Sequence, residues 1–316
     1  MGSIPEIRIP RGSFPAPMVI HARLDHRQTF IILHGRGSTA EKFGHALLST
    51  TSTLANETLQ TAFPHAKLIF PTASRNRATI YKRSYIHQWF DNWHLEDATR
   101  RQDLMRDGLF SSVGYIHSLL QAEIEDVGKE NVVLWGLSQG CATSLSTLLT
   151  WDGEPFAAVV GMCGWLPYSN ILLEIVQENG FESGWDPFSQ EESSDGSHLS
   201  SKDIDDYNEP SLHRNRIQRP QSDLPIQAVT FLRNEIGIEA KTGMVFQSIP
   251  VFLGHGTEDD KVHIELGRDA RTCLQQIGAD IQLIEYQDCG HWYSGEMLQD
   301  IFEFLKDRLK TISTGD

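Results

Sequence analysis

The sequence has few cysteines and a deficit of positive charge. Its 316 residues include only Cys141, Cys163, Cys273 and Cys289, and no two of these form a C-x-x-C motif. This scattering argues against a disulfide scaffold and against a structural zinc site. Lysine and arginine number 27 against 42 acidic residues, so the formal net charge is −15. Such a charge argues against a nucleic-acid partner, which would require a basic surface.

Long apolar runs and a signal-peptide layout are also missing. No run approaches the roughly 18 apolar residues that a membrane-spanning helix needs. The start lacks a charged region followed by an apolar one. Glu6 stands where a myristoylation motif would have Ser or Thr. Because 40% of the residues are hydrophobic, the chain can bury a core. We expect a cytoplasmic globular protein with no stable membrane insertion.

Short β-rich runs alternate with helical stretches along most of the chain. The expected strands are residues 28–33, 67–70, 131–135, 157–162, 250–253 and 281–286. The expected helices are residues 40–62, 104–124, 139–150, 264–278 and 296–309. The strands show little polar alternation, which is typical of strands buried on both faces. The pattern predicts an α/β fold whose mostly parallel central sheet is flanked by helices.

One stretch, about residues 168–248, lacks a strong strand. Its centre, residues 181–209, holds nine acidic residues and one lysine. One interpretation is a solvated surface insertion, and the other is a cap over an active site. The flanking residues 171–177 and 227–236 have the pattern of short amphipathic helices. We treat the stretch as an insertion, or possible lid, in a single domain of residues 1–316.

A candidate nucleophile lies in the chain's one G-x-S-x-G motif. The motif follows the expected strand 131–135 and precedes the expected helix 139–150, which is the context this motif requires. A serine on so sharp a turn adopts a strained backbone, and side chains two residues before and after it would collide. Gly136 and Gly140 remove that collision. We therefore expect Ser138 to be exposed to substrate as a nucleophile.

A serine hydroxyl needs a base and a group that orients the base. In this fold the acid and the histidine follow the serine in that order, each in a loop after a strand. Asp259 and Asp260 both follow the strand 250–253, and either could orient a histidine. His291 follows the strand 281–286 and precedes the last helix, so it is the candidate base.

Two backbone N–H groups are expected to stabilise the oxyanion of acyl transfer. One belongs to Gln139, the residue after the nucleophile. The other comes from the glycine-containing turn after the strand 28–33, where the N–H of Arg36 is the best candidate. We expect His34 to hold that turn through a hydrogen bond, and His255 to support the loop of the acid.

Several motifs together resemble the phospholipase/carboxylesterase family, whose best-known members are the acyl-protein thioesterases. They are Leu33-His34-Gly35-Arg36-Gly37, Gln88-Trp89-Phe90-Asp91, Gly136-Leu137-Ser138-Gln139-Gly140, Gly164-Trp165-Leu166-Pro167 and His255-Gly256-Thr257-Glu258-Asp259. The resemblance covers roughly residues 28–167 and 248–309. It implies an α/β-hydrolase fold, a Ser-Asp-His triad, no metal and no cofactor. The family's acid lies four residues after the His of the H-G pair, which selects Asp259.

The resemblance also implies that Trp89 and Phe90 line the acyl pocket, although plain core aromatics would give the same pattern. The sequence departs from the family at Arg36, where Leu is usual, and at Ser38, where Asp is usual. The family's cysteine near the amino terminus is absent, and the acidic insertion replaces a much shorter segment. These departures concern the substrate rather than the triad.

The resulting hypothesis is a serine hydrolase that cleaves a carboxylic ester or thioester through an acyl-enzyme. Its substrate would be a small molecule, a lipidated protein or a carrier-bound acyl group. One alternative is a specialised esterase, thioesterase or acyltransferase of secondary metabolism. Another is a binding protein without activity on the same fold.

Overall fold

A seven-stranded sheet runs through the centre of the protein. The computed structural model describes residues 13–94, 99–177, 224–239 and 243–309. The strands, in their order across the sheet, are β1 (Met18–Ile20), β3 (Ala66–Phe70), β2 (Gln28–Leu33), β6 (Val132–Leu137), β7 (Ala158–Met162), β8 (Val251–Gly256) and β9 (Ile281–Tyr286). All neighbours are parallel except β1, which runs antiparallel to β3. The predicted mostly parallel sheet is confirmed.

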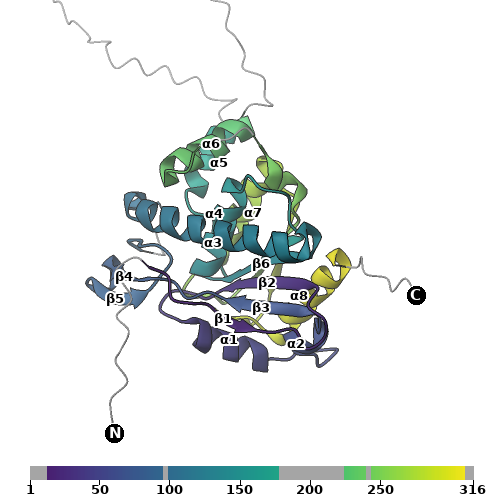
Figure 1. The fold of residues 1–316 in the computed structure, drawn as a ribbon. Coiled ribbons are helices and arrows are strands. Elements are labelled where there is room, and N and C mark those ends of the chain that lie inside the picture. The colour runs from purple at the N-terminus through teal and green to yellow at the C-terminus, as the bar shows by residue number, and fades with distance from the viewer. Residues whose placement is uncertain (1–12, 95–98, 178–223, 240–242, 310–316) are drawn as a thin grey trace, which may run out of the picture.

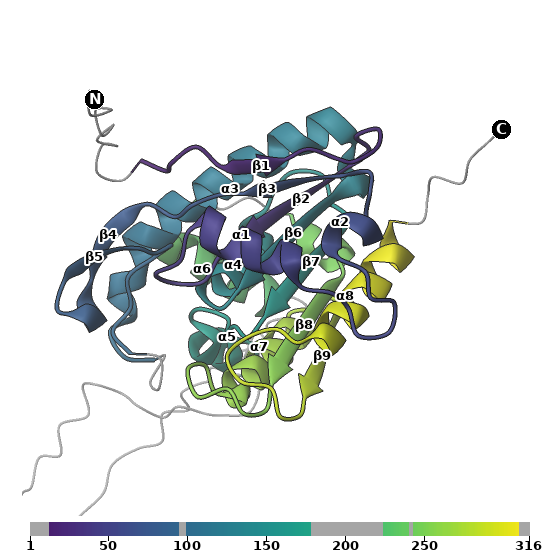
Figure 2. The ribbon, with the colours of Figure 1, turned by 90° about the horizontal axis from the view of Figure 1, so that it is seen from below.

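Helices cover both faces of this sheet (Figures 1 and 2). The helices are α1 (Ala40–Ser49), α2 (Leu59–Ala62), α3 (Arg106–Val127), α4 (Gln139–Thr150), α5 (Ser169–Gln177), α6 (Leu224–Ile236), α7 (Ile264–Gln276) and α8 (Gly295–Arg308). Short 3-10 turns add η1 (Thr79–Tyr81), η2 (Gln102–Met105), η3 (Lys129–Asn131) and η5 (Val245–Ser248). Helices α1, α2 and α8 pack on one face of the sheet and form one hydrophobic core with it. Helices α3 to α7 pack on the other face and form a second core.

The apolar strands explain why both faces must be covered. Successive side chains of a strand point to opposite faces. In β2, Phe30 and Ile32 belong to the core beside α1 and α8, whereas Ile31 and Leu33 belong to the core beside α3 and α4. All four are fully buried. A strand with successive apolar side chains on both faces is buried by helices on both faces of the sheet.

The prediction of one helix over residues 40–62 is wrong. The structure has α1 and α2 there, separated by residues 50–58, which are rich in Thr and Ser. Such short polar side chains bond to nearby backbone groups in non-helical conformations. The Ser52 hydroxyl accepts from the Glu57 N–H at 3.2 Å, and Thr58 forms a capping box with Thr61 at the start of α2.

A small hairpin was not anticipated from the sequence. Strands β4 (Arg75–Ala78) and β5 (Ser84–His87) pair antiparallel and enclose η1. Both strands are short and polar, so they lack the apolar signal of the central strands. The hairpin projects beside the carboxyl end of the sheet in Figure 2 and carries Tyr81 at its tip region.

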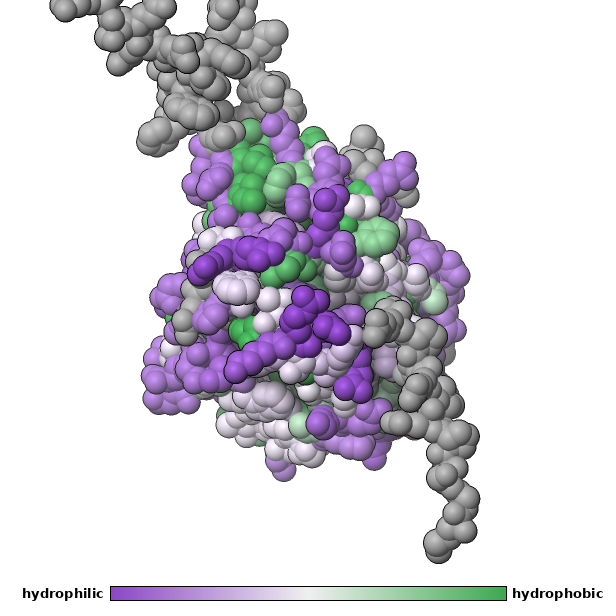
Figure 3. All heavy atoms as spheres, turned by 90° about the vertical axis from the view of Figure 1, so that its left-hand side faces the viewer, coloured by the Kyte–Doolittle hydropathy of each residue, from purple (hydrophilic) through white to green (hydrophobic). Residues whose placement is uncertain are grey.

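The predicted insertion is described at its two flanks. The expected helices at residues 171–177 and 227–236 are confirmed as α5 and α6, which pack against each other. Figure 3 shows a mostly hydrophilic face, with its largest apolar group in the upper part, where Figure 1 places these helices. The acidic centre, residues 181–209, lies outside the described residues, so the cap interpretation stays a prediction. Within the described ranges, no helix is long and apolar enough to cross a bilayer.

Candidate active site

Four loops bring the predicted site residues to one edge of the sheet. Ser138 follows β6, Asp259 lies in the loop after β8, His291 in the loop after β9, and Arg36 in the loop after β2. The carboxyl ends of parallel strands share one edge, which is where open α/β sheets bind their ligands. The sheet order therefore gathers residues that are up to 255 positions apart, from 36 to 291.

Ser138 has a backbone conformation that residues other than glycine rarely adopt. Its φ is 56° and its ψ −119°. The flanking glycines make this turn possible. A Cβ on Gly136 would lie 2.3 Å from the backbone of Gly140, and a Cβ on Gly140 would lie 2.4 Å from the Leu33 carbonyl oxygen. The absence of these side chains lets the start of α4 lie directly against the sheet.

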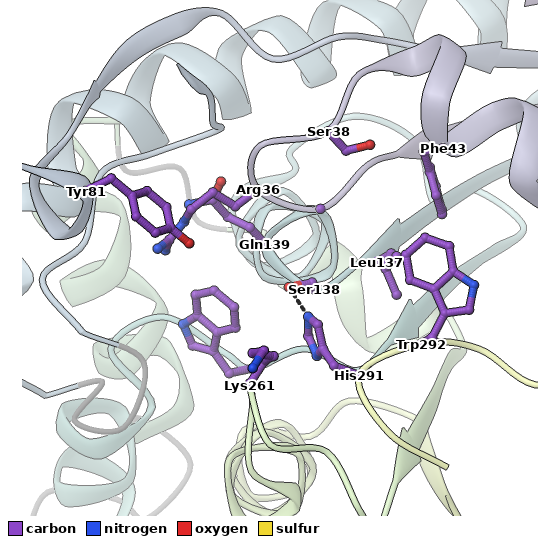
Figure 4. Close-up of a pocket in the computed structure, with 12 residues that line it drawn as sticks. Arg36, Ser38, Phe43, Tyr81, Leu137, Ser138, Gln139, Lys261, His291 and Trp292 are labelled. Carbon is purple, nitrogen blue, oxygen red and sulfur yellow. Dashed lines mark hydrogen bonds between the residues drawn. The ribbon is translucent and has the colours of Figure 1, made fainter. Parts of the chain in front are cut away.

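The three predicted triad residues form one hydrogen-bonded chain. His291 Nε2 lies 2.9 Å from Ser138 Oγ (Figure 4). On its other side, His291 Nδ1 lies 2.8 Å from Asp259 Oδ2. Asp260, the alternative acid, is exposed and pairs with Lys261 at 2.9 Å. The geometry therefore distinguishes the two aspartates, as the family spacing does.

Asp259 is held as a carboxylate by several donors. Its Oδ1 accepts from the backbone N–H groups of Lys261 at 2.9 Å and Val262 at 2.8 Å. Its Oδ2 lies 3.3 Å from His255 Nε2 as well as close to His291. Burial alone would raise the pKa of Asp259, but the hydrogen bonds from His255, His291 and Val262 outweigh it and lower that pKa. The buried acid therefore stays charged at neutral pH.

His34 fixes the loop that passes over Ser138. Its Nε2 accepts from the Ala73 N–H at 3.0 Å, so Nδ1 carries the proton and donates to the Gly35 carbonyl at 2.7 Å. Burial lowers the pKa of His34 to about 4, so the ring is neutral at pH 7. A Cβ on Gly35 would lie 3.4 Å from the Cβ of Ser138. The loop with Arg36 therefore lies beside the serine, as expected.

Gln139 is the first residue of α4, and the first N–H groups of a helix have no partner within the helix, so the Gln139 N–H is free of the helix ladder. The Gln139 side chain is buried and bonds to the backbone of two successive residues of another segment. Its Oε1 accepts from the Trp89 N–H at 3.0 Å, and its Nε2 donates to the Phe90 carbonyl at 2.7 Å. The Trp89 indole N–H in turn donates to the His34 carbonyl at 2.8 Å.

These contacts correct the expected position of Trp89 and Phe90. Their side chains are 0% and 1% exposed, and neither residue lines the cavity at Ser138. They contact the loop that carries Arg36 and the first residue of α4, Gln139, from the side away from the cavity. The sequence motif correctly placed Trp89 and Phe90 near the site. The motif alone does not distinguish aromatic side chains that line a pocket from those buried behind it.

A cavity of about 250 Å³ opens at Ser138 (Figure 4). Phe43, Leu137 and Trp292 form an apolar side, and Arg36 and Tyr81 lie on the other side of the serine in Figure 4. The remaining lining residues are Gly35, Ser38, Gln139, Trp165, Lys261 and His291. Most of these lining residues were not predicted from the sequence. Trp292 could have been, because it directly follows the predicted base His291.

One group of possible metal ligands occurs in the part of the chain that the structure describes. His26, Glu123 and Asp126 bring ligand atoms within 4.8 Å of one another. Lys67 already bonds this group, at 2.6 Å from Glu123 and 3.1 Å from Asp126. The group lies apart from the cavity at Ser138, none of whose lining residues it includes. All four cysteines are described, and each is free.

The family model of the phospholipase/carboxylesterase family matches residues 15–180 and 230–309, which is more than half of the chain. The chain belongs to the phospholipase/carboxylesterase family. Between these two matched ranges, residues 181–229 are unmatched, and they lie inside the predicted insertion of residues 168–248.

Individual family members are similar over different lengths. Acyl-protein thioesterase 1 of Yarrowia lipolytica is 30% identical over 161 residues, which are 50% of this chain and 66% of that protein. Thus the match spans less than two thirds of this relative. Counterparts from Cryptococcus neoformans and Schizosaccharomyces pombe are covered over 61% and 62% of their lengths. Carboxylesterase SOBER1 of Arabidopsis thaliana is 24% identical, over 91% of this chain and 93% of that protein.

Solved structures of family members have the same fold. Acyl-protein thioesterase 2 of Zea mays has a TM-score of 0.60 at 20% identity, covering 93% of this chain and 98% of that one. SOBER1 of Arabidopsis thaliana has a TM-score of 0.56, also at 20% identity, covering 90% and 99%. The predicted α/β-hydrolase fold is confirmed.

Proposed function

We propose that the protein hydrolyses a carboxylic ester or thioester through an acyl-enzyme on Ser138. The observation that carries this proposal is the hydrogen-bonded chain from Ser138 Oγ through His291 to Asp259, with distances of 2.9 and 2.8 Å. A serine with an adjacent base that is itself oriented by a third group is the arrangement that activates a hydroxyl. Membership of a family that includes named thioesterases and carboxylesterases supports the same reaction class.

In the first half-reaction, Ser138 Oγ attacks the carbonyl carbon while His291 Nε2 takes the hydroxyl proton. Asp259 fixes the imidazole and stabilises its charged form without accepting the proton itself. Collapse of the tetrahedral intermediate breaks the bond to the alcohol or thiol, and His291 returns the proton to that leaving group. The acyl group is then bonded to Ser138.

In the second half-reaction, His291 takes a proton from water, and the resulting hydroxide attacks the acyl-serine. Collapse releases the carboxylic acid and returns the proton to Ser138 Oγ. In both halves the negative carbonyl oxygen binds the N–H groups of Arg36 and Gln139. Each such donor contributes about 3–4 kcal/mol to the stability of the transition state. An acyltransferase would differ only in replacing water with another acceptor.

The test is covalent labelling by a fluorophosphonate, which reacts with an activated serine. We expect intact mass spectrometry to show one added phosphonyl group, located on Ser138 by peptide mapping. Ser138→Ala should not be labelled, and Ser144→Ala, which changes another buried serine on α4, should be labelled like the wild type. A folded wild-type protein that stays unlabelled would contradict an activated serine.

Substrate class is tested by comparing short nitrophenyl esters, long acyl thioesters and an acyl group on a carrier protein. Hydrolysis of any of these, lost in Ser138→Ala, supports the proposed reaction. A protein without turnover on all three and without labelling would favour the alternative of a binding protein.

A further inference from the structure

The cavity at Ser138 has a cationic side that the hydrolysis of a neutral ester does not require. Arg36 and Lys261 both line it, together with the Tyr81 hydroxyl (Figure 4). The whole chain carries a net charge of −15. The two positive side chains beside the nucleophile are therefore opposite in sign to the net charge of the protein. Lys261 is 63% exposed and pairs with Asp260, so it reaches the mouth of the cavity.

The Arg36 guanidinium is incompletely paired. Among the described residues, its Nε and Nη2 are buried and have no hydrogen-bond acceptor. Tyr81 lies beside the guanidinium in the cavity wall, and burial lowers the pKa of Arg36 although Tyr81 and the nearby Asp91 act to raise it. The Asp91 carboxylate is already occupied, because it accepts from both the N–H and the hydroxyl of Thr79. A buried cation with unpaired donors is costly unless a ligand supplies acceptors.

The unpaired atoms of Arg36, Nε and Nη2, are the two guanidinium nitrogens that can together bind both oxygens of one carboxylate. Elsewhere in this protein, Nε and Nη2 of Arg268 hold both oxygens of Glu285, at 2.8 and 2.6 Å. Such bidentate pairs combine charge with a fixed geometry. Tyr81 is 52% exposed, so its side chain can turn toward solvent without disturbing the core when an anion reaches Arg36.

We propose that the substrate is an ester or thioester bearing a carboxylate, which Arg36 binds while Phe43, Leu137 and Trp292 hold an apolar group on the other side of Ser138. This inference rests on the proposed function, and it assigns the Arg36 side chain a role in specificity that is separate from its backbone N–H. The carboxylate belongs either to the acyl group or to the leaving group, and the experiment separates the two.

The test compares kcat/KM for pairs of esters in which a carboxylate is replaced by an uncharged carboxamide of similar size and shape. For the acyl side, the pair is the 4-nitrophenyl monoester of adipic acid and that of adipamic acid. For the leaving-group side, it is 4-carboxyphenyl pentanoate and 4-carbamoylphenyl pentanoate. We expect the wild type to prefer the carboxylate over the carboxamide at least tenfold in one pair. Without a recognition cation, the negative protein would disfavour the anionic ester.

Three variants assign the preference to Arg36. Arg36→Leu keeps the backbone N–H and should reduce the ratio to one or below, whereas Arg36→Lys should leave an intermediate ratio because it keeps charge without the fork. Arg23→Leu removes the same charge from an exposed residue before β2, at the opposite end of that strand, and should keep the wild-type ratio.

The outcomes separate this inference from the proposed function. If the wild type hydrolyses the carboxamide esters as well as the carboxylates in both pairs, the inference is overturned and the hydrolase activity stands. If neither ester of either pair is hydrolysed and Ser138 is not labelled, the proposed function itself fails. A wild-type preference that Arg36→Lys keeps undiminished would also overturn the role of the guanidinium fork, even if Arg36→Leu does not fold.

Discussion

Trp89 and His34 are joined by a hydrogen bond that locks together two loops of the site. The indole N–H lies 2.8 Å from the His34 carbonyl oxygen, and the Trp89 backbone N–H binds Gln139. The loop that carries Arg36 and the first turn of α4, which carries Gln139, are therefore fixed to the same tryptophan. A residue that does not line the cavity thus positions the groups that are proposed to bind the reacting oxygen.

Trp89→Phe should lower kcat roughly tenfold and leave KM nearly unchanged. The phenyl ring keeps much of the packing, but the His34 carbonyl loses its donor and the Arg36 loop loses a fixed position. Full loss of one oxyanion donor costs about 10²–10³ in rate, so partial displacement costs less. The measurement is a steady-state comparison on a neutral short-chain ester. A raised KM at constant kcat would instead indicate that Trp89 binds substrate.

Trp151→Phe is the matched control for this change. Trp151 is also buried, and its indole N–H donates to the Glu154 carbonyl at 2.7 Å, at the end of α4 remote from Ser138. It should lose stability through a similar lost hydrogen bond while kcat stays at the wild-type value. Equal losses of kcat in both variants would contradict a positioning role that is specific to Trp89.

His34 should make the folded state less stable as the pH falls from 6.5 to 4. Burial lowers its pKa from 6.5 to about 4. In this range the unfolded chain binds a proton that the folded protein does not, so the contribution of His34 is complete above pH 6.5 and is lost as the pH falls. The full change amounts to about 3 kcal/mol.

This prediction is checked by measuring the free energy of unfolding in urea at several pH values, for the wild type and for His34→Gln. His34→Gln, which does not titrate, should show a flatter loss of stability between pH 6.5 and 4 than the wild type. His21→Gln, at an exposed histidine, should follow the wild-type curve. Parallel curves for wild type and His34→Gln would contradict the neutral, buried state of His34.

The parts of the fold that were predictable are those where burial alone decides the structure. The strand of residues 28–33 and the helix of residues 139–150 have the expected boundaries, because an apolar run and a glycine turn define their ends. Strand β1 and the β4–β5 hairpin were not predicted. They are short and polar or lie at an edge, so they depend on tertiary contacts rather than on a local pattern.

In the candidate site, only the residues that directly follow the strands of the central sheet were predictable from the sequence. Ser138, Asp259 and His291 each follow a strand, so the sheet topology alone brings them to one edge. The cavity walls were not predictable, because Phe43 comes from α1 and Tyr81 from the unexpected hairpin. Whether an aromatic side chain such as Trp89 faces a cavity or a backbone carbonyl depends on angles that the sequence pattern does not encode.

Gly140→Ala should destabilise the protein by about 1–3 kcal/mol, the usual cost of forcing atoms into a packed site. The added Cβ would lie 2.4 Å from the Leu33 carbonyl oxygen, which is backbone and cannot turn away. Gly114→Ala is the control, because an added Cβ there meets nothing within 4 Å and Gly114 lies inside α3. This control should gain about 0.5–1 kcal/mol. Chemical denaturation measures both, and equal effects would contradict the close approach of α4 to β2.

Asp259→Asn should lower kcat by about 10⁴, the loss typical of a triad whose histidine is no longer held in the correct tautomer. The asparagine fits the same space, and its NH₂ group can donate to His291 Nδ1 where the carboxylate accepted. Asp260→Asn is the matched control, since this exposed neighbour bonds only the Lys261 side chain among the described contacts and should stay within about twofold of wild type. Both variants are compared by kcat on one neutral ester and by fluorophosphonate labelling rate. Similar losses in the two variants would remove the basis for choosing Asp259, because only its Oδ2 lies 2.8 Å from the imidazole.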